Sequence, residues 1–156
     1  FLFTKLGKAI RFEQDQIRPM GRTAGGVKAI SLKNDDAVVG MEGIRKGDEN
    51  GWLLIVTEKG YGKKSKLHHY KTQNRGGSGV KVSKISTKTG AVVGAQVVNQ
   101  ETKNMIAISH TGNIIKVDVK KHVPTLGRDT QGVKLMKLSR GDVVASIAIT
   151  KEGEEE

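Results

Sequence analysis

The tripeptide Gly79-Val80-Lys81 occurs twice more in this chain of 156 residues, as Gly26-Val27-Lys28 and as Gly132-Val133-Lys134. The interval is 53 residues in both cases. Chance can place one short motif at a regular interval, so further features at the same interval decide whether the chain is a true repeat.

Four more features recur in the same order around the tripeptide, at intervals of 51 to 54 residues, and together they identify a triplicated unit of about fifty residues. An Arg stands four residues before each Gly, a Val-Val pair follows, a turn glycine precedes, and a basic residue lies four residues after that turn glycine. In chain order these are Arg22, Arg75 and Arg128; residues 38–39, 92–93 and 143–144; Gly7, Gly60 and Gly112; and Arg11, Lys64 and Lys116.

The local pattern within each unit indicates β-strands. Residues 52–57 and 105–109 are short apolar runs that end at turn residues, and residues 114–119 alternate as a half-buried strand does. The tripeptide is expected to open a third strand and the Val-Val segment to form a fourth. Four strands per repeat predict an all-β, propeller-like array of four-stranded antiparallel blades over residues 1–150, divided at about 1–50, 51–103 and 104–150.

The charge of the chain is strongly positive, with 27 Lys and Arg against 16 Asp and Glu, a net +11. Residues 151–156 contain four glutamates and one lysine, so the chain without them carries +14. A basic body with an acidic end predicts a surface for a polyanion and a tail that competes for that surface. The apolar runs are too short to span a bilayer, so no membrane segment is expected.

Basic residues that recur at one place in every repeat form a spaced row in a rigid array, and such a row can follow a phosphate backbone without reading bases. For the arginines a second interpretation is open, in which they are structural and donate to backbone carbonyls. The candidate DNA-binding residues are Arg11, Arg22, Lys28, Lys63, Lys64, Arg75, Lys81, Lys116, Arg128 and Lys134.

No catalytic constellation is visible in the sequence. The chain has no Cys, its four histidines lack the spacing of metal ligands, and Gly76-Gly-Ser-Gly79 lacks the Lys and hydroxyl pair of a phosphate-binding loop. We therefore expect no catalytic residue, no metal site and no cofactor in this chain.

Three runs resemble the C-terminal domain of the DNA gyrase A protein: Gly60-Tyr-Gly-Lys-Lys64, Gln73-Asn-Arg-Gly-Gly-Ser-Gly-Val80 and Gly127-Arg-Asp-Thr-Gln-Gly-Val133. The resemblance implies a β-pinwheel, with four-stranded blades that exchange strands between neighbours. It also implies that duplex DNA wraps around a basic perimeter with a positive handedness, so that the whole enzyme introduces negative supercoils using ATP. That family's domain has about six blades, so three would form an open arc.

The gyrase resemblance departs from the family pattern at its hallmark box, Gln-Arg-Arg-Gly-Gly-Lys-Gly, which belongs to the first blade. The nearest stretch here lacks two of the basic residues, which implies the degenerate equivalent in a later blade, so that this piece binds DNA but does not supercoil it alone. The residues of this stretch are Gln73, Asn74, Arg75, Gly76, Gly77, Ser78 and Gly79.

The same resemblance implies the partners and the setting. They are duplex DNA, the gyrase A N-terminal domain in the same polypeptide, and the gyrase B protein in a holoenzyme with two copies of each, in the bacterial cytoplasm at the nucleoid. ATP and magnesium would act elsewhere in that holoenzyme. Two alternatives are open: the equivalent domain of topoisomerase IV, and a propeller-like scaffold that binds protein.

Overall fold

Each of the three repeats begins with a β-hairpin, and the computed structural model of the chain describes residues 1–151. Gly7, Gly60 and Gly112 turn the hairpins at φ of +78°, +76° and +84°, a region that residues with a Cβ rarely adopt. The hairpins are β1 (Leu2–Thr4) with β2 (Lys8–Ile10), β4 (Trp52–Thr57) with β5 (Tyr61–Lys66), and β8 (Thr102–Ser109) with β9 (Ile114–Asp118).

The Val-Val segment of each repeat returns as a strand that pairs antiparallel with the first strand of its own hairpin. These strands are β3 (Val38–Met41), β7 (Val92–Val98) and β11 (Val144–Lys151). Short helical turns complete the elements: 3-10 turns at Gln14–Gln16 and Leu67–His69, and α1 at Val119–His122. Within the described range α1 is the only α-helix and has four residues, so the all-β prediction is confirmed.

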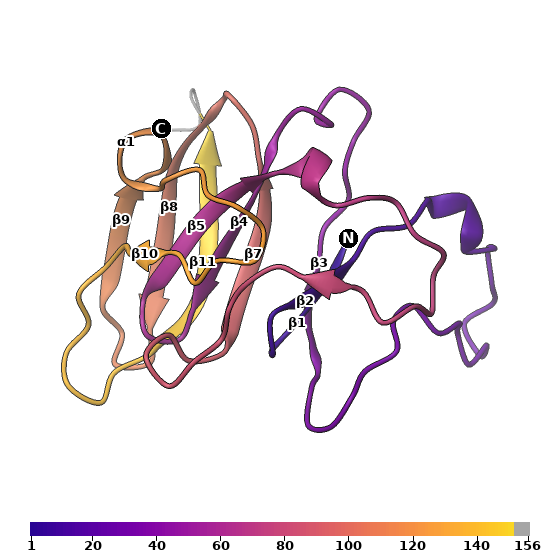
Figure 1. Ribbon diagram of the computed structural model, residues 1–156, viewed down its shortest axis with the longest axis horizontal. Helices are drawn as coiled ribbons and strands as arrows, with labels where there is room; N and C mark the ends of the chain where they lie inside the picture. Colours follow the sequence, from indigo (N-terminus) through magenta and orange to yellow (C-terminus); the bar gives the residue numbers. More distant parts are fainter. Residues whose placement is uncertain (152–156) are drawn as a thin grey trace.

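The fourth strand of each complete sheet comes from the next repeat. β6 (Val80–Lys81) belongs to the second repeat but pairs with β2 of the first, and β10 (Val133–Lys134) belongs to the third but pairs with β5 of the second. The sheet orders are β3-β1-β2-β6, β10-β5-β4-β7 and β11-β8-β9. We call β6 and β10 the exchange strands, and the contact of each with the preceding hairpin a seam (Figure 1).

The prediction of a strand at the first tripeptide, Gly26-Val27-Lys28, is wrong, because this segment is irregular in the structure. The reason is the strand exchange: each of the two later tripeptide strands pairs with the hairpin of the repeat before it. Among the described residues no hairpin precedes the first repeat, and the hairpin of the first repeat already pairs with β6. Gly26 nevertheless has a positive φ of +78°, close to the +66° of Gly79 and the +81° of Gly132 at the same place in the later repeats.

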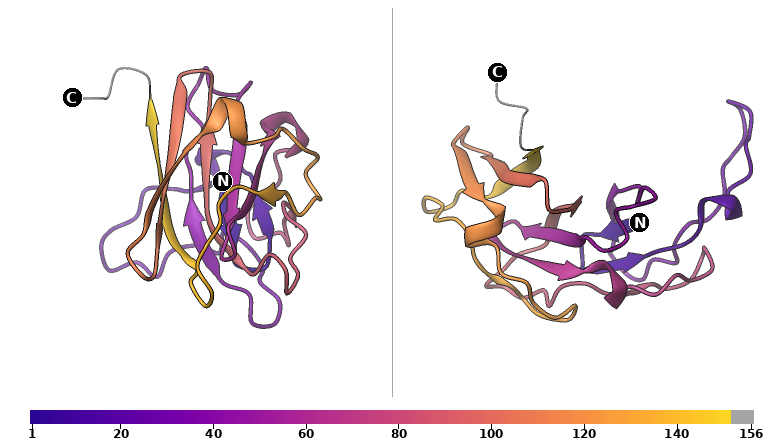
Figure 2. Two further views of the ribbon diagram at one scale, coloured as in Figure 1. Left: turned by 90° about the vertical axis from the view of Figure 1, so that its left-hand side faces the viewer. Right: turned by 90° about the horizontal axis from the view of Figure 1, so that it is seen from above.

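The repeats follow one another along an open arc (Figure 2, right). The third repeat lies at one end, and the loop between β2 and β3 extends from the other. The described chain does not close on itself in this view.

Two apolar cores fill the spaces between neighbouring sheets, and β4 contributes to both. Leu53 and Ile55 belong to the core shared with the first repeat, while Leu54 and Val56 belong to the core shared with the third. Because successive strand residues point to opposite faces, a strand buried on both faces must be apolar throughout, which explains the run at residues 52–56.

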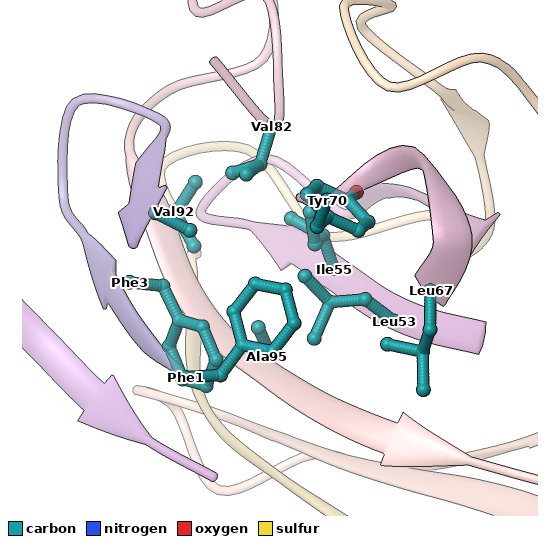
Figure 3. Packing of buried hydrophobic residues seen from close by; sticks show 10 residues of the cluster. Phe1, Phe3, Leu53, Ile55, Leu67, Tyr70, Val82, Val92 and Ala95 are labelled. Carbon is teal, nitrogen blue, oxygen red and sulfur yellow. The ribbon is translucent and has the colours of Figure 1, made fainter. Parts of the chain in front are cut away.

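Aromatic side chains fill the core between the first two repeats (Figure 3). Phe1 meets Tyr70 edge to face with ring centroids 5.2 Å apart, and Phe3 is buried beside them. Tyr70 is 1% exposed, so this ring packs in the core and is not available to stack on a base.

Candidate nucleic-acid interface

The exchange strands place the lysines of the tripeptide on the outer side of each seam. Lys81 faces Lys8 across the pairing of β6 with β2, and Lys134 faces Tyr61 across the pairing of β10 with β5. All three tripeptide lysines are exposed, with 68% of the Lys81 side chain accessible, and we call Lys28, Lys81 and Lys134 the rim lysines. Lys81 Nζ also lies 4.0 Å from Asp129 Oδ2, an ion pair between two exposed side chains that contributes little to stability.

Two further exposed lysines follow the rim lysines along the chain, and the sequence-based prediction did not include them. Lys84 and Lys137 stand three residues after Lys81 and Lys134, and both are exposed. Their 53-residue interval was a usable signal, but the first repeat has Ser31 at this place, so the triplet was incomplete.

Two of the three arginines that precede the tripeptide, Arg75 and Arg128, donate to backbone carbonyls. Arg75 Nη1 donates to the carbonyl oxygen of Lys28 at 3.1 Å, and Arg128 Nη1 donates to that of Lys81 at 2.6 Å. In both cases the acceptor is the rim lysine 47 residues earlier. Arg22, the first member of the series, is exposed.

Two of the basic residues that follow the turn glycines, Arg11 and Lys64, also reach the next repeat. Arg11 Nη1 donates to the carbonyl oxygens of Leu67 and Tyr70, both at 3.4 Å, and Lys64 Nζ donates to that of Val119 at 2.8 Å. Burial lowers the pKa of Lys64. Lys116, the third of the series, is exposed on β9.

Lys63 is 1% exposed, so the structure places this candidate inside the fold and away from the rim. Its ammonium donates to the carbonyl oxygens of Gly127 and Arg128, both at 2.6 Å, and to Thr130 Oγ1 at 3.1 Å. Burial lowers the pKa of Lys63 to about 8, with Asp129 opposing the effect.

The stretch equivalent to the hallmark box, residues 73–79, leads into β6 and lies along the first repeat. The Gln73 N–H donates to Arg11 O at 2.7 Å, the Gly76 N–H donates to Ala29 O at 2.7 Å, and Ser31 Oγ donates to Gly76 O at 2.7 Å. A Cβ on Gly79 would collide with the carbonyl oxygen of Ala9, so this position must be Gly. Asn74 and Ser78 are exposed and Gly77 is half-buried.

Among residues 1–151, no group of three or more His, Asp or Glu side chains could hold a metal ion. Within the same residues, no helix is long and apolar enough to cross a membrane. The proposed competition by the acidic tail concerns residues 152–156, which lie outside the described part of the chain.

Curated relatives match nearly the whole chain. The DNA gyrase A protein of Staphylococcus epidermidis is 40% identical over 143 residues, which are 92% of this chain and 16% of the relative. That of Kosmotoga olearia is 44% identical over 146 residues, 94% of this chain and 18% of the relative. The chain therefore spans less than a fifth of the length of these relatives.

Two solved structures share the fold. A DNA gyrase A C-terminal domain superposes with a TM-score of 0.80 at 27% identity, over 95% of this chain and 49% of that one. A DNA topoisomerase IV C-terminal domain superposes with a TM-score of 0.87 at 22% identity, over 97% and 46%, and at this identity shows the fold alone.

A family model described as the DNA gyrase C-terminal domain, beta-propeller, matches residues 1–44, 51–99 and 103–151, close to the three repeats seen in the sequence. With these matches and with exchange strands joining its sheets, the chain belongs to the DNA gyrase C-terminal domain family.

Proposed function

We propose that this chain binds duplex DNA along its outer rim and bends it, without reading the base sequence. The observation that carries the proposal is that the rim lysine is exposed in every repeat, on an exchange strand for Lys81 and Lys134 and in an irregular segment for Lys28. Each ammonium can neutralise a phosphate and release a counterion, and phosphate contacts carry no direct sequence information. A curved row of such contacts favours a curved duplex.

The proposal places this binding in a gyrase, a type IIA topoisomerase that introduces negative supercoils with ATP. The relatives carry the name of the DNA gyrase A protein, which supports gyrase over topoisomerase IV. In that setting the chain is a non-catalytic part of gyrase A, with the N-terminal domain in the same polypeptide and with gyrase B as partner. Catalysis, ATP and magnesium belong to other parts of the holoenzyme, in the bacterial cytoplasm.

The solved gyrase domain is about twice the length of this chain, which supports the chain being about half of such a domain. The degenerate box at residues 73–79 favours the later half. The chain would then bind DNA without supercoiling it alone. In the same proposal residues 152–156 weaken binding by competing for the rim lysines, and deleting residues 151–156 would raise the affinity for DNA at low salt.

The salt dependence of duplex affinity tests this function. The logarithm of the binding constant should fall with the logarithm of salt concentration, and replacing all three rim lysines by Ala should make that slope less negative by about 2.7, since each phosphate contact contributes about 0.9. The loss should be similar for unrelated sequences. Lys46→Ala is the control, because Lys46 is exposed but does not belong to a Gly-Val-Lys tripeptide. A flat salt dependence of the unsubstituted chain would refute DNA binding by the rim.

A further inference from the structure

The segments that carry the rim lysines are bonded to one another in series. The Ser31 N–H donates to Gly77 O at 2.8 Å, and the Lys84 N–H donates to Thr130 O at 3.2 Å. Residues 28–31 are thus joined to the loop that leads into β6, and residues 81–84 to the loop that leads into β10. The rim has its own continuous backbone connection in addition to the apolar cores.

Arg75 and Arg128 complete each of these junctions. Each guanidinium reaches from the later loop to the carbonyl oxygen of the rim lysine in the earlier segment, 47 residues before it. Arg75 Nε also donates to Gln16 O at 3.1 Å, and its own N–H donates to Gln16 Oε1 at 2.8 Å. Both arginines are half-buried, whereas the rim lysines are exposed.

We infer that Arg75 and Arg128 are positioning residues that set the spacing and direction of the rim lysines, and that they do not themselves neutralise phosphates. The inference rests on the proposed function for its DNA readouts. It separates the periodic basic residues into lysines that meet the duplex and arginines that hold the peptide groups of those lysines.

Loss of an arginine should leave the fold intact. Hydrogen bonds to charged groups contribute roughly 1.5–3 kcal/mol, and the freed carbonyl lies near the surface where water can bind it. The exchange strands keep their pairing with β2 and β5, and both cores are untouched. What changes is the restraint between successive rim segments, and with it the curvature that the rim imposes on bound DNA.

Hydrogen exchange of the free chain tests the restraint without DNA. The double variant Arg75→Ala/Arg128→Ala should lose at least fivefold protection at residues 28–31 and 81–84, while the β4 amides stay protected. The variant Arg75→Ala/Arg128→Lys should regain protection at residues 81–84, because the ammonium of a lysine at position 128 can donate to the same carbonyl of Lys81. Unchanged exchange in the double variant would overturn the inference.

Duplex binding then separates positioning from phosphate contact. The double variant should keep the salt slope of the unsubstituted chain, while end-to-end energy transfer on a duplex labelled at both ends should show at least a twofold smaller bend. A slope less negative by about 1.8 with an unchanged bend would mean two lost phosphate contacts and would overturn the inference.

Arg22→Ala is the matched control, since Arg22 holds the same repeat position but is exposed and makes neither of these two bonds. It should leave exchange and bending unchanged, and equal effects of Arg22→Ala and Arg128→Ala would again favour phosphate contact. If the unsubstituted chain binds no duplex, the proposed function fails, and the exchange measurements still decide the positioning role.

Discussion

Gly132 lies against Gly62 at the seam between β10 and β5, where a Cβ on Gly132 would stand 2.5 Å from the carbonyl oxygen of Gly62. Gly132 also has a φ of +81°. Two separate penalties therefore fall on any side chain at this position, one from backbone conformation and one from the seam.

The first prediction separates these two penalties. Gly132→Ala should destabilise the chain by about 3 kcal/mol or more, because left-handed backbone with a Cβ costs roughly 1–2 kcal/mol and the contact with backbone cannot relax cheaply. Gly26→Ala is the control, with φ of +78° and nothing within 4 Å of its Cβ, so it should lose only the first part. Urea unfolding of both variants measures the difference, and equal losses would mean that the seam is not close-packed.

A second prediction concerns the two faces of β4. Leu53→Ala and Leu54→Ala should each cost about 2–5 kcal/mol, since both side chains are fully buried. Their local effects should differ, because Leu53 faces the core with the first repeat and Leu54 the core with the third. Hydrogen exchange should rise in β1 and β2 for Leu53→Ala and in β8 and β9 for Leu54→Ala. The same exchange pattern in both variants would contradict the assignment of the two cores.

The third prediction uses the buried ammonium of Lys63, whose folded pKa of about 8 lies below its ordinary 10.5. Between these values the unfolded chain holds more protons than the folded one, so stability must rise with pH. Relative to Lys63→Met, the unsubstituted chain should gain roughly 2 kcal/mol between pH 8 and pH 10.5. Urea unfolding across this range measures the gain, and a constant difference would mean that Lys63 titrates alike in both states.

A fourth prediction concerns Asp142, whose carboxylate accepts hydrogen bonds from the backbone N–H and the hydroxyl of Thr111 and from the Val143 N–H. The hydroxyls of Ser109 and Thr111 lower the pKa of Asp142 to about 2. The folded pKa is depressed, so this contribution to stability is complete above about pH 4 and is lost as the pH falls through 2. The stability difference between the unsubstituted chain and Asp142→Asn should therefore shrink between pH 4 and pH 2. Asp35→Asn, at an exposed loop carboxylate, serves as the comparison.

The hairpins, the Val-Val strands and the exposure of the rim lysines follow from local sequence, because turn glycines and alternation act within a few residues. The hairpin with which each tripeptide strand pairs cannot be predicted from local sequence, because a strand of two residues has the same pattern whichever hairpin it joins. The arginine bonds span 47 residues and leave no local pattern that separates them from phosphate contacts.

Lys63 shows where the repeat could have been used further. Its place in the hairpin is taken by Ile10 in the first repeat and by Ile115 in the third, which indicates an inward position. A run of two lysines on a strand puts them on opposite faces, so one of Lys63 and Lys64 had to turn inward. The acceptors that stabilise a buried ammonium there come from the third repeat and could not be predicted from the hairpin alone.

The borrowed outer strands have a consequence for synthesis of the chain. β2 ends at Ile10, but the sheet that it belongs to is complete only when Lys81 has joined it. At about 5–20 residues per second, a ribosome needs roughly 4–14 s to make the intervening segment, which is long compared with the time a hairpin takes to form. The first and second repeats therefore each wait for the following one before their outer edge is covered, and the array matures in the direction of translation.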